Sequence, residues 1–198
     1  MDSDITIRPP QSVGEMRGVR RVDARCWAEA YDHILPEDHL PDPEAEPDEK
    51  RLREQFEYAT TLNETESGRY VVAVDDDDGD ATAADDGTAA DDGATVVGFA
   101  ATRWGDEAKS FVGDDDAGLW VLYVDPSWWG RGVGTELLDA VTSAIPTQFE
   151  HLVLEAFAEN RRARQFYRSK GFETTDRIET SFWEETYAVV LMKRTLPR

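Results

Sequence analysis

The sequence is poor in cysteine, in lysine and in long apolar runs. Its only cysteine, Cys26, excludes an internal disulfide framework and any zinc cluster built from several cysteines. No apolar run approaches the roughly 20 residues that a membrane-spanning helix requires. The N-terminus is acidic and lacks the charged and then apolar pattern of a signal peptide. These absences favour a soluble, cytoplasmic protein.

Positive charge is also scarce. The chain has 21 Lys and Arg against 42 Asp and Glu, a formal net charge of −21. Nucleic-acid binding requires a basic face, and an anionic membrane repels such a chain, so we expect neither among its partners. Acidic residues occur in every segment, which favours a surface adapted to high salt over an acidic interaction tail.

Length and patterning indicate one domain, residues 1–198, with a core of ordinary size. Residues 75–93 consist only of Asp, Gly, Ala and Thr and include nine Asp. Such a segment has nothing to bury, so we expect an acidic low-complexity hairpin insertion there. Its Asp repeats lack the spacing and the closing Glu of a calcium-binding EF-hand loop.

Periodicity predicts alternating strands and helices around this insertion. A buried strand over 119–124, a helix from 133 and a strand over 151–157 form a strand–helix–strand unit. Such a unit indicates a mixed sheet with helices on both faces. The other predicted strands are 5–9, 69–74, 95–104, 172–181 and 186–195, and the other predicted helices are 13–34, 48–61 and 160–170.

Three glycines at alternate positions, Gly130, Gly132 and Gly134, separate the buried strand from its helix. They let a ligand approach the backbone closely, and the N-terminus of the helix favours a phosphate there. No Gly-Lys-Ser/Thr follows, and Thr135 replaces the third glycine of a dinucleotide fingerprint. A tight strand-to-helix turn that binds no ligand is the alternative.

Two segments together resemble a known family. Residues 123–138, Tyr-Val-Asp-Pro-Ser-Trp-Trp-Gly-Arg-Gly-Val-Gly-Thr-Glu-Leu-Leu, resemble the acyl-CoA-binding motif of the GNAT superfamily of N-acetyltransferases. Residues 160–172, from Asn160 through Phe166-Tyr167 to Gly171-Phe172, resemble its second motif. The resemblance implies an α+β fold with a mixed, mostly antiparallel sheet, helices on both faces and a splay at the acyl-CoA site. It also implies acetyl-CoA as co-substrate, with no metal.

The resemblance also implies which residues contact the cofactor. The family has Gln or Arg where this chain has Trp129, so the backbone amides after Trp129 are expected to hold the pyrophosphate. Residues 161–170 concentrate basic side chains near the expected position of the phosphates. The predicted cofactor-binding residues are Leu122, Tyr123, Val124, Arg131, Gly132, Val133, Gly134, Thr135, Asn160 and Arg164. Asn160 is either the cap of its helix or a contact to the pantetheine arm of the cofactor, or both.

Two residues are candidates for acid–base chemistry. By resemblance, Tyr167 takes the position that protonates the departing CoA thiolate; a core tyrosine is the alternative. Glu155 lies within the apolar run Leu-Val-Leu-Glu-Ala-Phe and is the candidate general base. A glutamate at the sheet rim paired with an arginine explains the same pattern equally well.

The acceptor side is expected to lie on the first two helices. Trp27 and Tyr31, four residues apart, either line an acceptor pocket or pack in the core. The three histidines show no metal-ligand spacing. We expect transfer of an acetyl group to a primary amine on a small molecule or a peptide. A non-catalytic acyl-CoA-binding sensor or interaction module is the alternative function, and a homodimer is left open.

Overall fold

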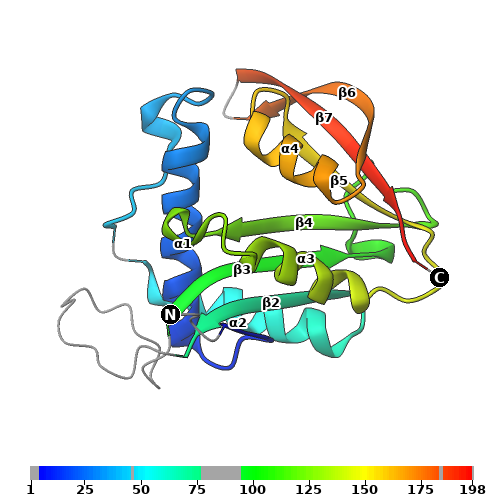
Figure 1. Cartoon of the computed structure of the whole chain (residues 1–198). Helices are drawn as coiled ribbons and strands as arrows, with labels where there is room; N and C mark the ends of the chain where they lie inside the picture. Colours follow the sequence, from blue (N-terminus) through cyan, green and yellow to red (C-terminus); the bar gives the residue numbers. More distant parts are fainter. Residues whose placement is uncertain (1–4, 46, 77–94, 183–184, 198) are drawn as a thin grey trace.

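The computed structural model describes residues 5–45, 47–76, 95–182 and 185–197 of the chain (Figure 1). The predicted acidic insertion lies mostly outside these residues, because only Asp75 and Asp76 of it are described. Asp75 is the last residue of a strand, so the regular sheet extends one residue into the predicted insertion. No helix in the described ranges combines the length and the apolar character needed to cross a membrane.

Within the described residues, seven strands form one sheet in the order β1-β2-β3-β4-β5-β7-β6. Every neighbouring pair is antiparallel except β4 and β5, which are parallel and connected through a helix. The predicted mixed, mostly antiparallel sheet is therefore confirmed. The strands are β1 (Ile5–Arg8), β2 (Gly68–Asp75), β3 (Thr95–Arg103), β4 (Asp116–Val124), β5 (His151–Phe157), β6 (Glu173–Phe182) and β7 (Glu185–Thr195).

Helices cover both faces of this sheet. α1 (Val13–Tyr31) and α2 (Glu49–Glu64) bury apolar side chains such as Met16 and Leu52 against β2 and β3. α3 (Val133–Ser143) covers the opposite face, and Tyr167 of α4 (Arg161–Ser169) joins the same apolar cluster. Figure 1 shows α3 in front of β3 and α2 behind the sheet. Each helix therefore packs the apolar stripe that its periodicity predicts.

The predicted burial of β4 on both faces is wrong for its C-terminal half. β4 and β5 pair only between residues 116–118 and 151–153, and the pairing does not extend beyond Gly118. Past this point Trp120 is 39% exposed, and residues 121–123 are half-buried. The apolar run lines an opening between two diverging strands instead of a closed core. This divergence is the splay that the resemblance implies.

A shortened connection between β2 and β3 tests the predicted insertion. Asp75 of β2 and Thr95 of β3 are paired neighbours, so the ladder is complete without residues 76–94. A two-residue Asn-Gly turn is the connection that such a paired antiparallel ladder accepts best. Replacing 76–94 with Asn-Gly should leave the thermal melting temperature and CoA binding within a few per cent of wild type. A lost cooperative transition in a melting scan would mean that the segment stabilises the fold.

Candidate active site

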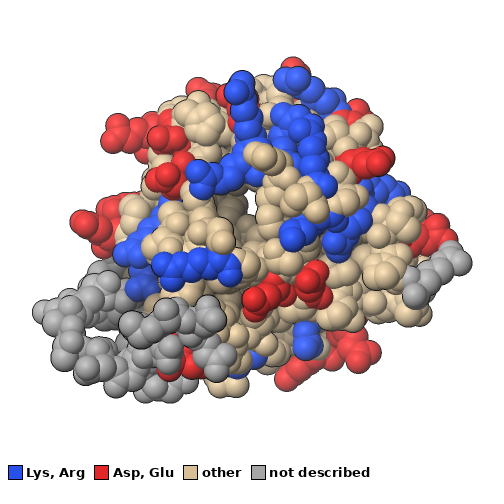
Figure 2. Space-filling model, in the orientation of Figure 1, with Lys and Arg blue, Asp and Glu red and all other residues tan. Residues whose placement is uncertain are grey.

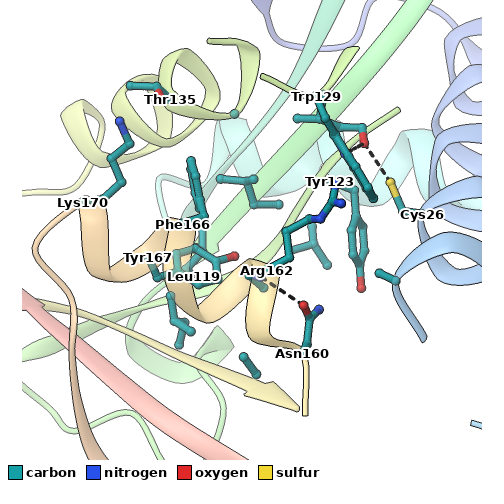
Figure 3. A pocket seen from close by; sticks show the side chains of 18 of the residues that line it. Cys26, Leu119, Tyr123, Trp129, Thr135, Asn160, Arg162, Phe166, Tyr167 and Lys170 are labelled. Atoms are coloured by element: carbon teal, nitrogen blue, oxygen red, sulfur yellow. Dashed lines mark hydrogen bonds between the residues drawn. The ribbon is translucent and has the colours of Figure 1, made fainter. Parts of the chain in front are cut away.

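A cavity of about 620 Å³ opens where β4 and β5 diverge (Figure 3). This volume is in the usual range for small-molecule sites. Its walls come from four elements that are distant in sequence: α1, β4 with the glycine segment after it, the end of β5, and α4. The residues that line it include Cys26, Tyr31, Leu122, Tyr123, Val124, Trp128, Trp129, Gly132, Val133, Gly134, Thr135, Glu155, Asn160, Arg162, Phe166, Tyr167 and Lys170.

The glycine segment forms one rim of the cavity. Gly130 and Gly132 have backbone φ angles of 80° and 95°, which residues other than glycine rarely adopt. Gly132 caps α3, and its carbonyl accepts the N–H groups of Thr135 and Glu136 at 2.8 and 3.2 Å. The N–H groups of Val133 and Gly134 have no acceptor among the described residues. The first turn of α3 thus presents unpaired donors and a partial positive charge to the cavity.

The space in front of these donors is open. A Cβ atom added to Gly134 would meet Phe166 at 3.6 Å, and one added to Gly130 would meet nothing within 4 Å. Gly134 therefore keeps free a volume that a larger side chain would fill. An anion of phosphate size can approach the amides there, so the residues present fit the predicted pyrophosphate.

The edge of β4 provides further donors. The Asp125 N–H bonds to the Val97 carbonyl of β3 at 2.8 Å. Alternate residues of a strand direct their N–H groups to opposite neighbours, so the amides of Leu122 and Val124 point away from β3. β5 does not pair with β4 at this height, which leaves these two amides facing the cavity. Leu122, Tyr123 and Val124 all line it, as their predicted role requires.

Trp129 is fixed against the end of β4. Its indole Nε1–H donates to the Val124 carbonyl at 2.7 Å, and the thiol of Cys26 donates to the same oxygen at 3.0 Å. The face of the Trp129 ring contacts the Arg162 guanidinium, 4.1 Å from its centroid (Figure 3). The only hydrogen-bond donor of the indole is therefore used within the protein.

Tyr167 lies in the wall opposite the glycine segment. Its ring packs edge-on against Phe166 and Phe172, with centroids 5.3 and 5.5 Å away. Among the described residues its hydroxyl makes no hydrogen bond, and the residue lines the cavity. Burial raises the pKa of Tyr167 well above that of a free phenol, so the hydroxyl keeps its proton at neutral pH.

Asn160 begins α4 beside this tyrosine. Its Oδ1 accepts the Ala163 N–H at 3.0 Å, which confirms the predicted helix cap. The side chain is buried and lines the cavity, so a contact with the cofactor, the other predicted role, is sterically open. That second role stays a prediction.

Glu155 lines the cavity from β5 and forms an ion pair with Lys109. The sequence-based alternative expected an arginine partner, and the structure places a lysine there. Lys109 lies in the segment between β3 and β4, next to the exposed Trp120 ring. Lys109 balances the charge of the carboxylate, so Glu155 is a paired glutamate, and its role as a general base stays a prediction.

On the α1 side, Tyr31 lines the cavity and Trp27 does not. The Tyr31 and Tyr123 hydroxyls are 3.4 Å apart, and burial raises the pKa of both. The Tyr31 ring packs edge-on against Trp27 and Phe157, each centroid 5.1 Å away. Trp27 thus supports Tyr31 from behind.

Two predicted arginines lie outside the cavity. Arg131 is exposed and stacks on Trp128, 4.7 Å from the ring centroid. Arg164 donates to the Ala158 carbonyl at 2.6 Å and closes the turn between β5 and α4. Arg162 and Lys170, which belong to the basic segment expected near the phosphates, line the cavity instead. The orientation of α4 about its axis places these two side chains at the cavity, and the amino-acid composition of the segment does not reveal that orientation.

Basic side chains gather around the opening despite the acidity of the chain. Figure 2 shows Lys and Arg around a hollow near the centre of this face. In the part of the chain that the structure describes, neither Arg162 nor Lys170 has a carboxylate within 4.0 Å. The described residues contain no cluster of His, Cys, Asp and Glu that could hold a metal ion. The local field at the cavity therefore favours an anionic ligand.

Solved structures that share this fold include three N-acetyltransferases. The PaiA N-acetyltransferase from Thermoplasma acidophilum, in complex with coenzyme A, is 18% identical with a TM-score of 0.62, covering 97% of this chain and 99% of that one. The ribosomal-protein-S18-alanine N-acetyltransferase from Escherichia coli is 17% identical with a TM-score of 0.58, covering 98% and 96%. A spermidine N-acetyltransferase chimera from Vibrio cholerae and hSSAT is 14% identical with a TM-score of 0.60, covering 98% and 96%.

No curated protein sequence matches the chain. At these sequence identities, the structural likenesses establish the fold and nothing more. The model of the acetyltransferase (GNAT) family matches residues 27–172, which include the C-terminal end of α1, all of α2, the glycine segment and Tyr167. The chain belongs to the GNAT family of acetyltransferases, whose acetyl donor is acetyl-CoA.

Proposed function

We propose that this cavity binds acetyl-CoA and that the chain transfers its acetyl group to a primary amine on a small molecule or a peptide. Acetyl-CoA supplies an activated acetyl group as a thioester. The observation that carries the proposal is the convergence of three features on one cavity: unpaired amides of α3, free amides of β4 and the hydroxyl of Tyr167.

The two sets of amides have separate roles in this proposal. The N–H groups of Val133 and Gly134, at the positive end of α3, bind the pyrophosphate. The amides of Leu122 and Val124 bind the pantetheine arm and polarise the thioester carbonyl. Both sets belong to rigid secondary structure, so they are in place before the ligand binds.

Tyr167 moves the proton. The neutral amine nitrogen forms a bond to the acetyl carbon while the carbon–sulfur bond breaks, and the sulfur leaves as a thiolate. The Tyr167 hydroxyl donates its proton to that sulfur, and the phenolate that results takes a proton back from water before the next turnover. Burial raises the pKa of Tyr167, so the donor is fully protonated at neutral pH. The amine nitrogen releases its surplus proton to water, directly or through Glu155, and the role of Glu155 as base stays a prediction.

A panel of amines tests the proposal. Acetyl-CoA is incubated at high salt with amino acids, polyamines, aminoglycosides and peptides with free N-termini or lysines, and released CoA thiol is measured. At least one amine class should increase thiol release well above hydrolysis in water and gain an acetyl group by mass. Saturable CoA binding without acetylation of any class would favour the alternative of a sensor module.

We also propose that the acidic surface is an adaptation to high salt. Exposed like charges repel one another at low ionic strength, and salt screens this repulsion. The melting temperature should therefore rise from about 0.1 M to above 1 M KCl, as the screening length falls from roughly 10 Å to roughly 3 Å. A flat or falling melting temperature over this range would favour the interaction-tail alternative.

A further inference from the structure

The pair formed by Arg162 and Trp129 links the two walls of the cavity. Trp129 follows η3 (Pro126–Trp128) on the glycine-segment side, and Arg162 lies in the first turn of α4 on the other side. Figure 3 shows the two side chains pointing toward one another. Both residues line the cavity, and the guanidinium is 4.1 Å from the ring centroid. Arg162 is exposed, and the contact therefore holds its cation at the rim of the cavity.

The indole itself has no donor left for a ligand. Its Nε1–H donates to the Val124 carbonyl at 2.7 Å, which also holds the ring in one orientation. A phosphate near residue 129 can thus obtain neither charge nor a hydrogen bond from Trp129. The guanidinium stacked on the ring is the group that offers both, because stacking leaves the in-plane N–H donors of an arginine free.

Arg162 is also free of competing anions. In a chain with 42 acidic residues and 21 basic ones, it has no carboxylate within 4.0 Å among the described residues. Arg164, two residues later, is committed to the Ala158 carbonyl, and Arg131 stacks on Trp128 outside the cavity. Of these three arginines, Arg162 is the one placed to meet a ligand inside.

We propose that Arg162 is a phosphate ligand of the bound CoA and that Trp129 positions the Arg162 side chain, an inference that rests on the proposed function. The indole face restricts the long arginine side chain before the ligand arrives, which lowers the entropy lost on binding. Two residues on opposite walls of the cavity thus share one task. Arg162 supplies the positive charge, and Trp129 fixes the orientation of the guanidinium.

Titration calorimetry with two ligands tests this assignment. CoA carries the phosphates, and acetyl-pantetheine lacks them. Arg162→Gln should weaken CoA binding roughly tenfold, as for the loss of a charge-assisted hydrogen bond, and leave acetyl-pantetheine binding within twofold. Arg168→Gln is the matched control on the same helix, because Arg168 is exposed and outside the cavity; it should leave both affinities within twofold.

Trp129 variants test the positioning role. Trp129→Leu should weaken CoA binding about as much as Arg162→Gln, and the double variant should be no weaker than either single one. Trp129→Phe keeps an aromatic face for the guanidinium, so it should recover part of the CoA affinity. The melting temperature of each variant identifies any that fails to fold.

The outcomes separate the two proposals. Wild-type protein that binds no CoA would contradict the proposed function itself. Wild-type protein that binds CoA, together with an Arg162→Gln variant that binds CoA equally well, would overturn the phosphate assignment alone. Equal losses for CoA and acetyl-pantetheine in a folded variant would also overturn it, since a phosphate ligand acts only on the phosphorylated compound. Additive losses in the double variant would overturn the role of Trp129.

Discussion

Replacing Tyr167 by phenylalanine should lower turnover with the best amine by roughly 10²–10⁴, the usual contribution of a general acid. The ring contacts with Phe166 and Phe172 do not involve the hydroxyl, so packing should be preserved. CoA affinity should stay within about twofold. Steady-state kinetics and titration calorimetry on the same preparation measure both quantities.

Tyr70→Phe is the matched control. Tyr70 is also a buried tyrosine, but it lies in the core on the other face of the sheet and contacts Gln55 and Phe99. Its replacement removes a hydroxyl without touching the cavity and should leave turnover within about twofold. Unchanged turnover in Tyr167→Phe would remove the hydroxyl from the mechanism. The cavity would then have a binding role only, and the sensor alternative would gain support.

Replacing Gly134 by valine should weaken CoA binding at least tenfold, about 1.4 kcal/mol. An added Cβ at Gly134 would be 3.6 Å from Phe166 and 3.7 Å from Val124, which is ordinary contact, so the backbone can accept a side chain. The two methyl groups of valine extend further, into the space in front of the α3 amides. The loss should therefore be steric and local to the phosphate position, and calorimetry measures it.

Gly134→Ala provides the graded control. Alanine favours the helix and adds only the Cβ atom, so this variant should be at least as stable as wild type and bind CoA with a smaller loss. Equal CoA affinity for the glycine, alanine and valine forms, in variants with wild-type melting temperatures, would mean that the segment is a turn without a ligand.

The sequence predicts the fold and the phosphate site for separable reasons. Alternation and helical periodicity locate the strands and helices because each buries one face. The glycines at 130 and 132 indicate a special backbone, which the φ angles of 80° and 95° confirm. Both signals are local in the chain, so neither depends on knowing which elements meet in space.

The parts that sequence reasoning missed depend on contacts between distant segments. An apolar run such as 119–124 looks the same whether its side chains pack on a neighbouring strand or line a cavity, so the exposure of Trp120 was not predicted. The Cys26 thiol donates a hydrogen bond to the carbonyl of Val124, which is 98 positions away in the sequence. The sequence does not distinguish Arg162 from Arg164, because both are arginines on one helix. The orientation of α4 about its axis places Arg162 at the cavity, whereas Arg164 donates to the Ala158 carbonyl.

The ion-pair partner of Glu155 is another feature that the sequence does not reveal. The sequence predicts a desolvated base or a paired rim glutamate with equal weight, because its neighbours in β5 are apolar. The partner, Lys109, belongs to a segment 46 positions earlier that carries no signal of its own. A pairing of this kind becomes visible only when the loop between β3 and β4 is placed in space.

Hydrogen exchange on the wild-type chain, with and without saturating CoA, tests most directly whether the cavity is the cofactor site. Binding should slow exchange at the amides of Val133 and Gly134, which have no partner in the protein, and at residues 122–124 of β4. Exchange in α2, on the opposite face of the sheet, should not change. Saturable CoA binding that leaves exchange at the glycine segment and β4 unchanged would contradict the assignment of this cavity to acetyl-CoA.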